Sequence, residues 1–394
     1  MIPYARQQVD QTDIDAVVAV LRADFLTQGP VVPRFEQAVA ARAGAAHAVA
    51  FNSATSALHA ACLALNLRAG DRLWTVPNTF VASANCARHC GALVDFVDID
   101  PATWNMSVTE LQAKLLRAQR DGTLPKVVVP VHFGGQPTEQ EHIHALAREY
   151  GFRVIEDASH ALGAARHGEP VGSCRWSDIT VLSFHPVKII TTGEGGMALT
   201  HDAELAASMA MLRSHGVTRD PRRFERAPVP QGDGTPPDPW YYEQQLLGFN
   251  FRLTDIHAAL GLSQLDRLEE FVGRRNALAS RYQEMLQGLP LRLPCVQPAN
   301  RSAFHLYVVR LKAAGGEARR RVCTALRRRG IGVNVHYLPV HLQPYYRSLG
   351  FREGQFPEAE AHGESAITLP LYPGLAETQQ DEVAMALRQE LTRA

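Results

Sequence analysis

Lysine is rare in this chain of 394 residues. Of its 40 basic residues only four are lysine, namely Lys114, Lys126, Lys188 and Lys312. Acidic residues also number 40, so the formal net charge is zero. Without a net charge or a basic block, the chain has no field that would draw it to nucleic acid or to an anionic membrane. We therefore expect neither as a partner.

Long apolar runs and a cysteine framework are also missing. No apolar run reaches about 18 residues, so the sequence predicts no transmembrane helix. The N-terminal stretch "MIPYARQQVDQTDID" is polar and acidic, unlike a signal peptide. Six cysteines are scattered without framework spacing, which favours a cytoplasmic location. The segment "CARHC" (Cys86–Cys90) has no second cysteine pair nearby, so we expect no metal site there.

What the chain does have is an ordinary globular composition. It is 46% hydrophobic and 20% charged, and its length allows a large core and two domains. Near the N-terminus, Thr12 is expected to cap a helix. Apolar residues then recur at the helical spacing i, i+3, i+4 and i+7, at Ile14, Val17, Val18 and Leu21.

Short apolar runs alternate with helical stretches through the first half of the chain. The predicted strands are His47–Phe51, Arg72–Val76, Leu93–Val97, Lys126–Val131, Arg153–Glu156, Ile179–Phe184 and Gly196–Thr200. Runs that are apolar on both faces and separated by helices indicate a mainly parallel sheet covered on both sides. The sequence thus predicts an α/β fold.

The pattern changes in the second half. Residues 219–240 are rich in proline, glycine and charge and predict a long loop. A long helix is expected from about Thr254, and the remainder, from about Leu291, predicts a smaller α+β unit. We therefore expect a large domain over residues 1–250, and a connecting helix with a small domain over residues 251–394.

Two polar side chains are predicted at the ends of strands. Lys188 follows the strand Ile179–Phe184, close to the sheet edge at which open parallel sheets bind ligands. A partly dehydrated amine there has a lowered pKa and can bond covalently to a carbonyl carbon, although a surface lysine beside a turn is the alternative. Asp157 ends another strand, 31 residues earlier. Its carboxylate can pair with the cationic ring nitrogen of pyridoxal phosphate (PLP), or it can cap the next helix.

Three further segments could complete such a site. "FNSATSAL" predicts a strand, a hydroxyl-rich turn and a helix start, which suits an anion, although Ser53 or Thr55 could simply cap the helix. Phe80 follows another strand and could lie flat on a cofactor ring or belong to the core. Asn250 and Arg252 precede the long helix and are suited to phosphate contact.

Ordered motifs along essentially the whole chain resemble a known family. The motifs are "LTQGPVVPRFE", "EDASHALGA", "SFHPVKIITTGEGG", "LRSHG", "GFNFRLTDIHAALGLSQL" and "VHYLPV". They resemble those of the DegT/DnrJ/EryC1/StrS sugar aminotransferases. The resemblance implies the PLP-dependent transferase fold type I, which is aspartate aminotransferase-like: a mainly parallel sheet in a large domain plus a smaller C-terminal α+β domain. It also implies pyridoxal 5′-phosphate as the cofactor.

The resemblance also implies roles at matching positions. Lys188 matches the lysine that binds PLP covalently, and Asp157 matches the carboxylate on the pyridine nitrogen. The other cofactor contacts implied are His160 beside the ring 3-hydroxyl, where many relatives have Gln, Phe80 stacked on the ring, and Ala54, Thr55 and Ser183 at the phosphate. Asn250 matches an asparagine that reaches the phosphate of the neighbouring subunit, which implies a homodimer with shared active sites. Tyr4, Thr27, His336 and Tyr337 match positions lining the sugar-nucleotide pocket.

Within the family, the motif combination is similar to the aminotransferases of pseudaminic acid biosynthesis. This implies amination at C4 of a UDP-linked 4-keto-6-deoxy-N-acetyl sugar, with L-glutamate as donor and 2-oxoglutarate as product. Dehydratases of the family have His in place of the lysine, so Lys188 favours transamination. The alternatives are a dTDP- or GDP-linked sugar, another PLP reaction such as a desulfurase, and a PLP-binding regulator. A regulator usually has a DNA-binding module, for which we see no basic patch.

Overall fold

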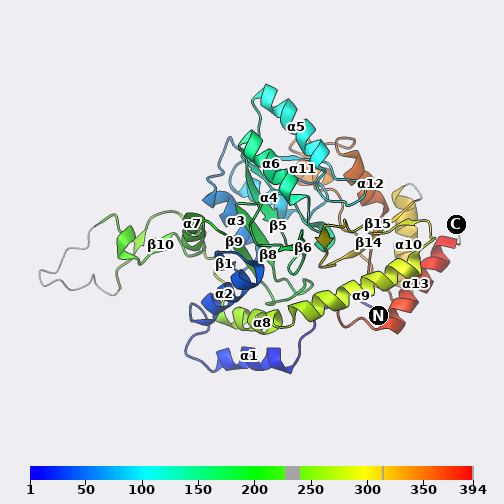
Figure 1. Ribbon diagram of the computed structural model, residues 1–394, viewed down its shortest axis with the longest axis horizontal. Helices are drawn as coiled ribbons and strands as arrows, with labels where there is room; N and C mark the ends of the chain where they lie inside the picture. The colour runs from blue at the N-terminus through cyan, green and yellow to red at the C-terminus, as the bar shows by residue number, and fades with distance from the viewer. Residues whose placement is uncertain (227–239, 313–314, 393–394) are drawn as a thin grey trace, which may run out of the picture.

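A seven-stranded sheet forms the centre of the larger unit in the computed structural model, which describes residues 1–226, 240–312 and 315–392 (Figure 1). In spatial order the strands are β1 (His47–Phe51), β9 (Gly196–Thr200), β8 (Ile179–Ser183), β5 (Arg153–Asp157), β4 (Val127–Val128), β2 (Arg72–Thr75) and β3 (Leu93–Phe96). Strand β9 pairs antiparallel with β1 and β8, whereas the pairs from β8 to β3 are parallel. The predicted α/β fold with a mainly parallel sheet is confirmed. The strand predicted at 126–131 is shorter than expected, because Pro130 has no N–H for the ladder.

Helices cover both faces of this sheet, because alternate residues of each strand point to opposite sides. On one face Val127 and Ile155 share a core with α3 (Ala54–Ala64), α4 (Ala82–His89) and α7 (Ala203–Arg213). On the other face Val128 and Val154 pack with α5 (Val108–Asp121) and α6 (Gln140–Tyr150). Leu182, also on that face, packs with α2 (Val31–Ala43) and α8 (Asp255–Leu265).

A smaller unit has its own core. Its antiparallel sheet consists of β12 (Leu291–Arg292), β14 (Tyr307–Leu311) and β15 (Ala366–Leu369). Helices α9 (Leu268–Leu286), α10 (Gly316–Arg328) and α13 (Glu377–Thr392) pack around this sheet. The chain start joins the unit, because the Ile2 N–H donates to the Gly330 carbonyl at 2.8 Å. Figure 1 accordingly shows both termini close to α13.

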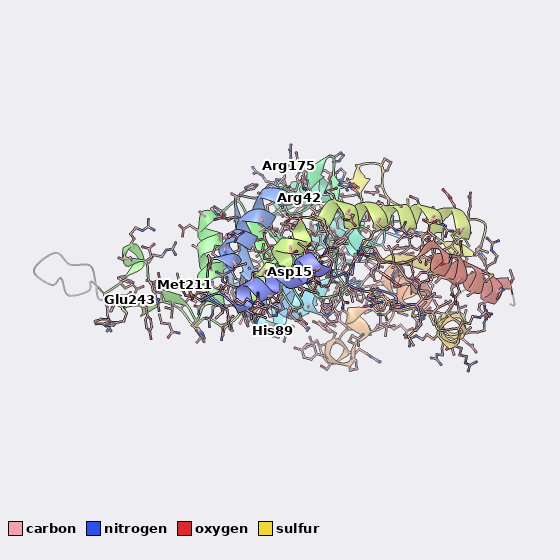
Figure 2. All side chains as sticks on the ribbon, turned by 90° about the horizontal axis from the view of Figure 1, so that it is seen from below. Asp15, Arg42, His89, Arg175, Met211 and Glu243 are labelled. Carbon is pink, nitrogen blue, oxygen red and sulfur yellow. The ribbon has the colours of Figure 1, made fainter. Side chains whose placement is uncertain are left out.

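Several further elements are short. They are β6 (Ala165–Arg166), β7 (Glu169–Pro170), β10 (Val217–Thr218), β11 (Glu243–Gln244), β13 (Asn300–Arg301), η1 (Phe133–Gly135), η2 (Pro221–Arg223), η3 (Val340–Leu342), α11 (Pro344–Arg347) and α12 (Pro357–Ser365). Strands β10 and β11 pair antiparallel at the base of the predicted loop 219–240, of which residues 227–239 lie outside the described part. Figure 2 shows Glu243 of β11 at the end of the molecule opposite α13.

Two sequence expectations about helices are wrong in detail. The long helix expected from Thr254 is two helices, α8 and α9, separated at Asp266 and Arg267. The first helix, α1 (Gln11–Leu21), is capped by Asp10 rather than Thr12, because the Asp10 carboxylate accepts the Asp13 N–H. In the described residues, none of the helices is long and apolar enough to cross a membrane.

Candidate active site

The candidate site lies where β5 and β8 end side by side. Asp157 is the last residue of β5 and Ser183 the last residue of β8, and the two strands pair in parallel. Lys188 follows in a turn, in which its own N–H donates to the His185 carbonyl at 2.9 Å. Burial lowers the pKa of Lys188 to about 8, although the charge of Asp157 acts in the opposite direction. The amine therefore has a substantial neutral fraction near pH 8, as a nucleophile or a proton carrier requires.

The Asp157 carboxylate is held on both of its oxygens. Its Oδ2 accepts the Ser83 hydroxyl at 2.6 Å, and its Oδ1 accepts the Ser159 N–H at 3.1 Å. Only 5% of Asp157 is exposed. The alternative that Asp157 caps a helix is wrong, because residues 158–164 form turns. Glu156 lies on the opposite face of β5, where it bonds Gln140 and Thr180.

Histidine and tyrosine side chains from distant segments meet beside Asp157. The His160 Nδ1 accepts the Gly134 N–H at 3.3 Å, so its Nε2, 3.2 Å from the Tyr337 hydroxyl, carries the ring proton. Burial lowers the pKa of His160 well below its usual range, and the charge of Lys188 adds to this effect. Burial and the nearby Asp157 charge raise the pKa of the Tyr337 hydroxyl. This cluster is therefore neutral at physiological pH.

His336 and Tyr4 extend the same cluster. The two rings lie 5.7 Å apart, and His336 Nδ1 is 2.7 Å from the Thr368 hydroxyl. Burial lowers the pKa of His336 to about 3, with a further contribution from Lys188. The His336 ring also lies 4.9 Å from that of Tyr337, so ring contacts join three of the four positions predicted to line a sugar pocket, close to Lys188.

The start of α3 lies against β9 and β8. Ser53 caps α3 by accepting the Ser56 N–H at 3.1 Å, so the capping alternative holds for Ser53. The N–H groups of the first turn, which includes Ala54 and Thr55, have no partner inside a helix and suit an anion. A Cβ at Gly196 would come within 2.3 Å of the Ala54 nitrogen, so only glycine permits this approach. Gly196 pairs with Ser183, which brings the predicted phosphate contacts together.

Two other predicted residues stand apart from this cluster. Thr27 bridges to Thr254, and Asn250 bridges to Ser214. Within the described part of the chain, no hydrogen bond, ion pair or ring contact joins either of them to Lys188 or Asp157. Phe80 is 60% exposed, but Ser83, three residues further along the chain, contacts Asp157.

Sequence reasoning missed several residues of this neighbourhood. The His305 ring lies 4.5 Å from that of His160, and its pKa is lowered well below the usual range by burial and by Lys188. Asn78 accepts the Tyr337 N–H at 3.1 Å, and Ser83 bonds Asp157. The residues of these pairs are 74 to 259 positions apart in the sequence, and no local sequence pattern predicts contacts over such separations. Of the other histidines considered, His341 pairs with Glu360 at 2.9 Å and His185 and His215 are exposed.

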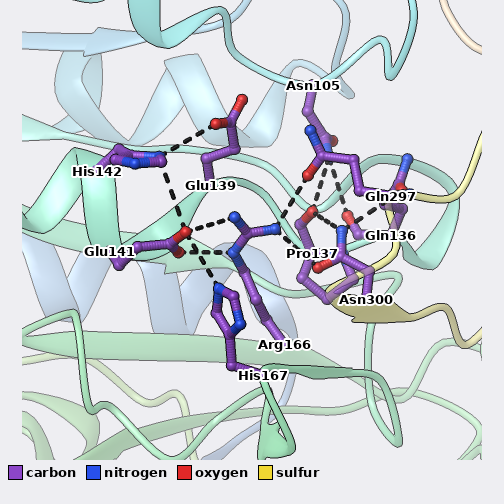
Figure 3. Close-up of polar contacts among 10 residues, drawn as sticks. All are labelled: Asn105, Gln136, Pro137, Glu139, Glu141, His142, Arg166, His167, Gln297 and Asn300. Atoms are coloured by element: carbon purple, nitrogen blue, oxygen red, sulfur yellow. Dashed lines mark hydrogen bonds and ion pairs between the residues drawn. The ribbon is translucent and has the colours of Figure 1, made fainter.

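A polar network supports the loop that carries Gly134 (Figure 3). The Arg166 guanidinium donates to Glu141 and, at 3.0 Å each, to Gln297 and Asn300. Gln136, directly after η1, accepts the Gln297 N–H at 2.8 Å. The network ties η1 to β6 and β13, and thereby fixes the N–H group that orients His160.

These residues fit PLP by their donor chemistry. A buried carboxylate suits a protonated ring nitrogen, free helix N–H groups suit the phosphate, and an amine with a lowered pKa suits the aldehyde carbon. Within the described residues, no group of three or more His, Cys, Asp or Glu side chains is arranged to hold a metal ion.

The chain is similar to known proteins in both sequence and structure. A model of the "DegT/DnrJ/EryC1/StrS aminotransferase family" matches residues 7–388. The spore coat polysaccharide biosynthesis protein SpsC of Bacillus subtilis is 38% identical over 392 residues, which cover 98% of this chain and 96% of that protein. The PMP-form of the putative sugar aminotransferase Spr1654 from Streptococcus pneumoniae superposes with a TM-score of 0.89 at 28% identity, and covers 100% of both chains. PseC of Helicobacter pylori, described as an aminotransferase involved in the biosynthesis of pseudoaminic acid, gives 0.88 at 29% identity with the same coverage.

Proposed function

The chain belongs to the DegT/DnrJ/EryC1/StrS aminotransferase family and is a PLP-dependent sugar aminotransferase, and from this premise we propose its substrates. The amino donor is L-glutamate, which leaves as 2-oxoglutarate. The acceptor is the C4 ketone of a UDP-linked 4-keto-6-deoxy-N-acetyl hexosamine, in pseudaminic acid biosynthesis. The motif combination in the sequence and the likeness to PseC support this choice. We also propose a cytoplasmic location, on the scattered cysteines.

The observation that carries the proposal is the partly buried Lys188 next to the buried Asp157 at one sheet edge. When bound, PLP supplies an electron sink for the charge left on a carbon that loses its proton. Asp157 would hold the ring nitrogen, and Lys188 would anchor the aldehyde carbon covalently. Once displaced by the donor, the Lys188 Nζ would take the proton from the glutamate α-carbon and pass it to the former aldehyde carbon of the cofactor. In the second half-reaction it delivers a proton to C4 of the sugar.

The neutral cluster would lie between the cofactor and the sugar, with His160 beside the ring 3-hydroxyl of the cofactor. His160 fixes the Tyr337 hydroxyl by donating to its oxygen, so the hydroxyl proton is free to donate to a substrate oxygen. His336, Tyr4 and Thr27 are proposed to line the same pocket. A neutral environment leaves Lys188 as the nearby group that exchanges protons at physiological pH.

We further propose a homodimer with shared active sites. Large apolar side chains are exposed on and near α1 and after the loop 219–240: Leu21, Phe25, Leu26, Trp240, Tyr242 and Leu247. Groups of exposed apolar residues of this kind mark interaction sites. Asn250, next to one of these groups, would contact the cofactor phosphate of the other subunit.

A substrate panel tests the proposal. UDP-, dTDP- and GDP-linked 4-keto sugars are each incubated with the holoenzyme and glutamate, and the products are identified by NMR. We expect amination at C4 of the UDP-linked N-acetyl sugar and much slower conversion of the others. A preference for a dTDP- or GDP-linked sugar would replace the substrate but keep the reaction class. Protein that binds PLP but aminates none of these sugars would instead favour a PLP-binding regulator.

Lys188→Ala is the matched test of the chemistry. It should abolish turnover together with the absorbance of covalently bound PLP. Normal turnover by this variant would contradict the role proposed for Lys188.

A further inference from the structure

Three buried oxygen-bearing side chains form a line that ends on Asp157. The Thr79 hydroxyl is 2.8 Å from the Ser83 hydroxyl, which is 2.6 Å from the Asp157 Oδ2. Thr79 is 3% exposed, Ser83 0% and Asp157 5%. The line is therefore shielded from water. Hydrogen bonds in such an interior are stronger than in water and polarise one another.

The direction of each proton follows from the chemistry of the groups. An ionised carboxylate can only accept hydrogen bonds, so Ser83 donates its single hydroxyl proton to Asp157. The Phe80 carbonyl is a second acceptor for Ser83 but lies at 3.4 Å, which makes it much the weaker one. Thr79 must then donate to Ser83. The hydroxyls form a one-way relay from Thr79 through Ser83 to Asp157.

One turn of chain presents this relay and a predicted cofactor contact on opposite sides. Thr79 lies in the bend that leads into α4, Ser83 is the second residue of that helix, and both side chains are buried. Phe80, between them, is 60% exposed and is the aromatic proposed to stack on the ring. Displacement of this turn would therefore move both the ring-stacking side chain and the hydroxyls that hold Asp157.

We propose that Ser83, supported by Thr79, is the positioning residue that keeps the Asp157 carboxylate ionised and fixed in orientation, so that the proton shared with the cofactor stays on the ring nitrogen. This rests on the proposed role of Asp157. Ser83 occupies one oxygen and the Ser159 N–H the other, which fixes the carboxylate plane. A hydroxyl donated to Oδ2 also stabilises negative charge there, so the carboxylate competes less for the shared proton.

The test measures the ring nitrogen directly. Holoenzyme is reconstituted with PLP labelled with ¹⁵N in the ring, and the nitrogen chemical shift is recorded by NMR together with kcat and KM. For Ser83→Ala we expect the shift to move toward the unprotonated value. We expect kcat to fall about 10- to 100-fold, the effect of losing one hydrogen bond to a charged group, with little change in the KM for glutamate.

Matched variants separate positioning from packing. Ser83→Thr keeps the hydroxyl and should restore the wild-type shift. Thr79→Val removes only the second hydroxyl and should move the shift in the same direction as Ser83→Ala, with a roughly threefold loss in kcat. Thr75→Val removes another buried hydroxyl, which donates to the Val129 carbonyl at 2.8 Å, and should leave the shift unchanged. If Ser83→Ala fails to fold, Ser83→Cys, with its weaker donor, and Thr79→Val carry the test.

Asp157→Asn distinguishes the two possible failures. If Asp157→Asn leaves the ring nitrogen unchanged, the role proposed for Asp157 is wrong. If Asp157→Asn moves the shift but Ser83→Ala, Ser83→Cys and Thr79→Val do not, the relay is overturned and the role of Asp157 stands. A shift in Thr75→Val as large as that in the relay variants would equally overturn the relay, because general packing would explain both.

Discussion

Burial decides the chemistry of Lys188. Its pKa is lowered to about 8 by loss of hydration, against the opposing charge of Asp157. Only the neutral amine attacks a carbonyl carbon, and its fraction rises as the pH passes through the pKa. We therefore expect the rate of covalent PLP capture by cofactor-free protein to rise between about pH 7 and 9 and then to level off.

Stopped-flow absorbance measures this rate. Asp157→Asn removes the charge that holds the pKa of Lys188 up, so its midpoint should lie at lower pH. Lys188→Arg should not capture PLP at any pH, because a guanidinium stays protonated. A midpoint near 10, the ordinary value for lysine, would contradict the burial described for this amine.

The two central side chains were predictable from sequence, and their supports were not. Strand ends in a parallel sheet share one edge, so two strand-end residues 31 apart were expected to meet. Ser83 lies 74 residues from Asp157, and its contact depends on how α4 packs against the sheet. His305 follows the same logic, since it reaches His160 only through the docking of the smaller unit. Long-range packing of this kind leaves no periodic trace in the sequence.

At the scale of elements, the first residue of α8 fixes the start of α2. The buried Asp255 carboxylate accepts the N–H groups of Gly29, Val31 and Val32 at 2.6, 2.8 and 3.0 Å. The segment it holds follows directly on Thr27, which is proposed to line the sugar pocket. Asp255→Ala should lower the free energy of unfolding by about 2 to 4 kcal/mol, because buried donors lose a charged acceptor. It should also raise the KM for the sugar.

Urea denaturation and steady-state kinetics measure both effects. Asp202→Ala is the control, because Asp202 caps α7 through the N–H groups of Glu204 and Leu205 on an exposed helix start. That variant should lose about 1 kcal/mol of stability and keep its KM. An unchanged KM in Asp255→Ala would mean that the segment after Thr27 does not shape the pocket.

The network around Arg166 joins elements in a pH-dependent way (Figure 3). Burial pushes the pKa of Glu141 up, but the hydrogen bonds and charge of Arg166 outweigh it and lower the pKa to about 2. A carboxyl whose folded pKa lies below its unfolded value stabilises the fold above the unfolded pKa. This contribution, about 2 kcal/mol after allowance for partial exposure, is lost as the pH falls from about 5 toward 2.

Glu141→Gln removes the contribution while keeping the shape of the side chain. The wild type should be more stable than this variant at pH 7, and the difference should shrink below about pH 5, as measured by urea denaturation at each pH. The exposed pair Arg281 and Asp381 offers a control, because Asp381→Asn should change stability little at any pH. A difference that stays constant down to pH 3 would exclude the proposed linkage.

Sequence patterns predicted the helices better than their packing partners and their ends. The apolar spacing of α1 is correct, yet Ile14 and Leu21 are 47% and 54% exposed, while Asp13 is buried against Ser263, Gln264 and Arg267. An amphipathic pattern predicts a helix but does not say which partner covers its apolar face. The break between α8 and α9 was missed because helix-forming residues continue across it, and Leu265 before the break and Leu268 after it pack into the same core.

At the scale of the molecule, the exposed apolar side chains near α1 and near the loop 219–240 favour a second copy of the chain as the partner that covers them. They lie near two segments assigned to the site, since Phe25 and Leu26 precede Thr27, and Leu247 precedes Asn250. In one chain, Asn250 makes no described contact with Lys188 or Asp157. A closed dimer is the commonest assembly that would bring such a residue to a site from outside.

Mixed dimers give the decisive measurement. Lys188→Ala and Asn250→Ala chains are co-expressed with different tags, and dimers carrying both tags are isolated. If Asn250 serves the other subunit, one site in each mixed dimer combines an intact Lys188 with an intact Asn250, and about half of the wild-type activity per dimer returns. If Asn250 served its own subunit, both sites would be defective and no activity would return. Mixed dimers of Lys188→Ala and Asp157→Asn are the control: both residues lie at one sheet edge of the same chain, so each site keeps one defect and stays inactive.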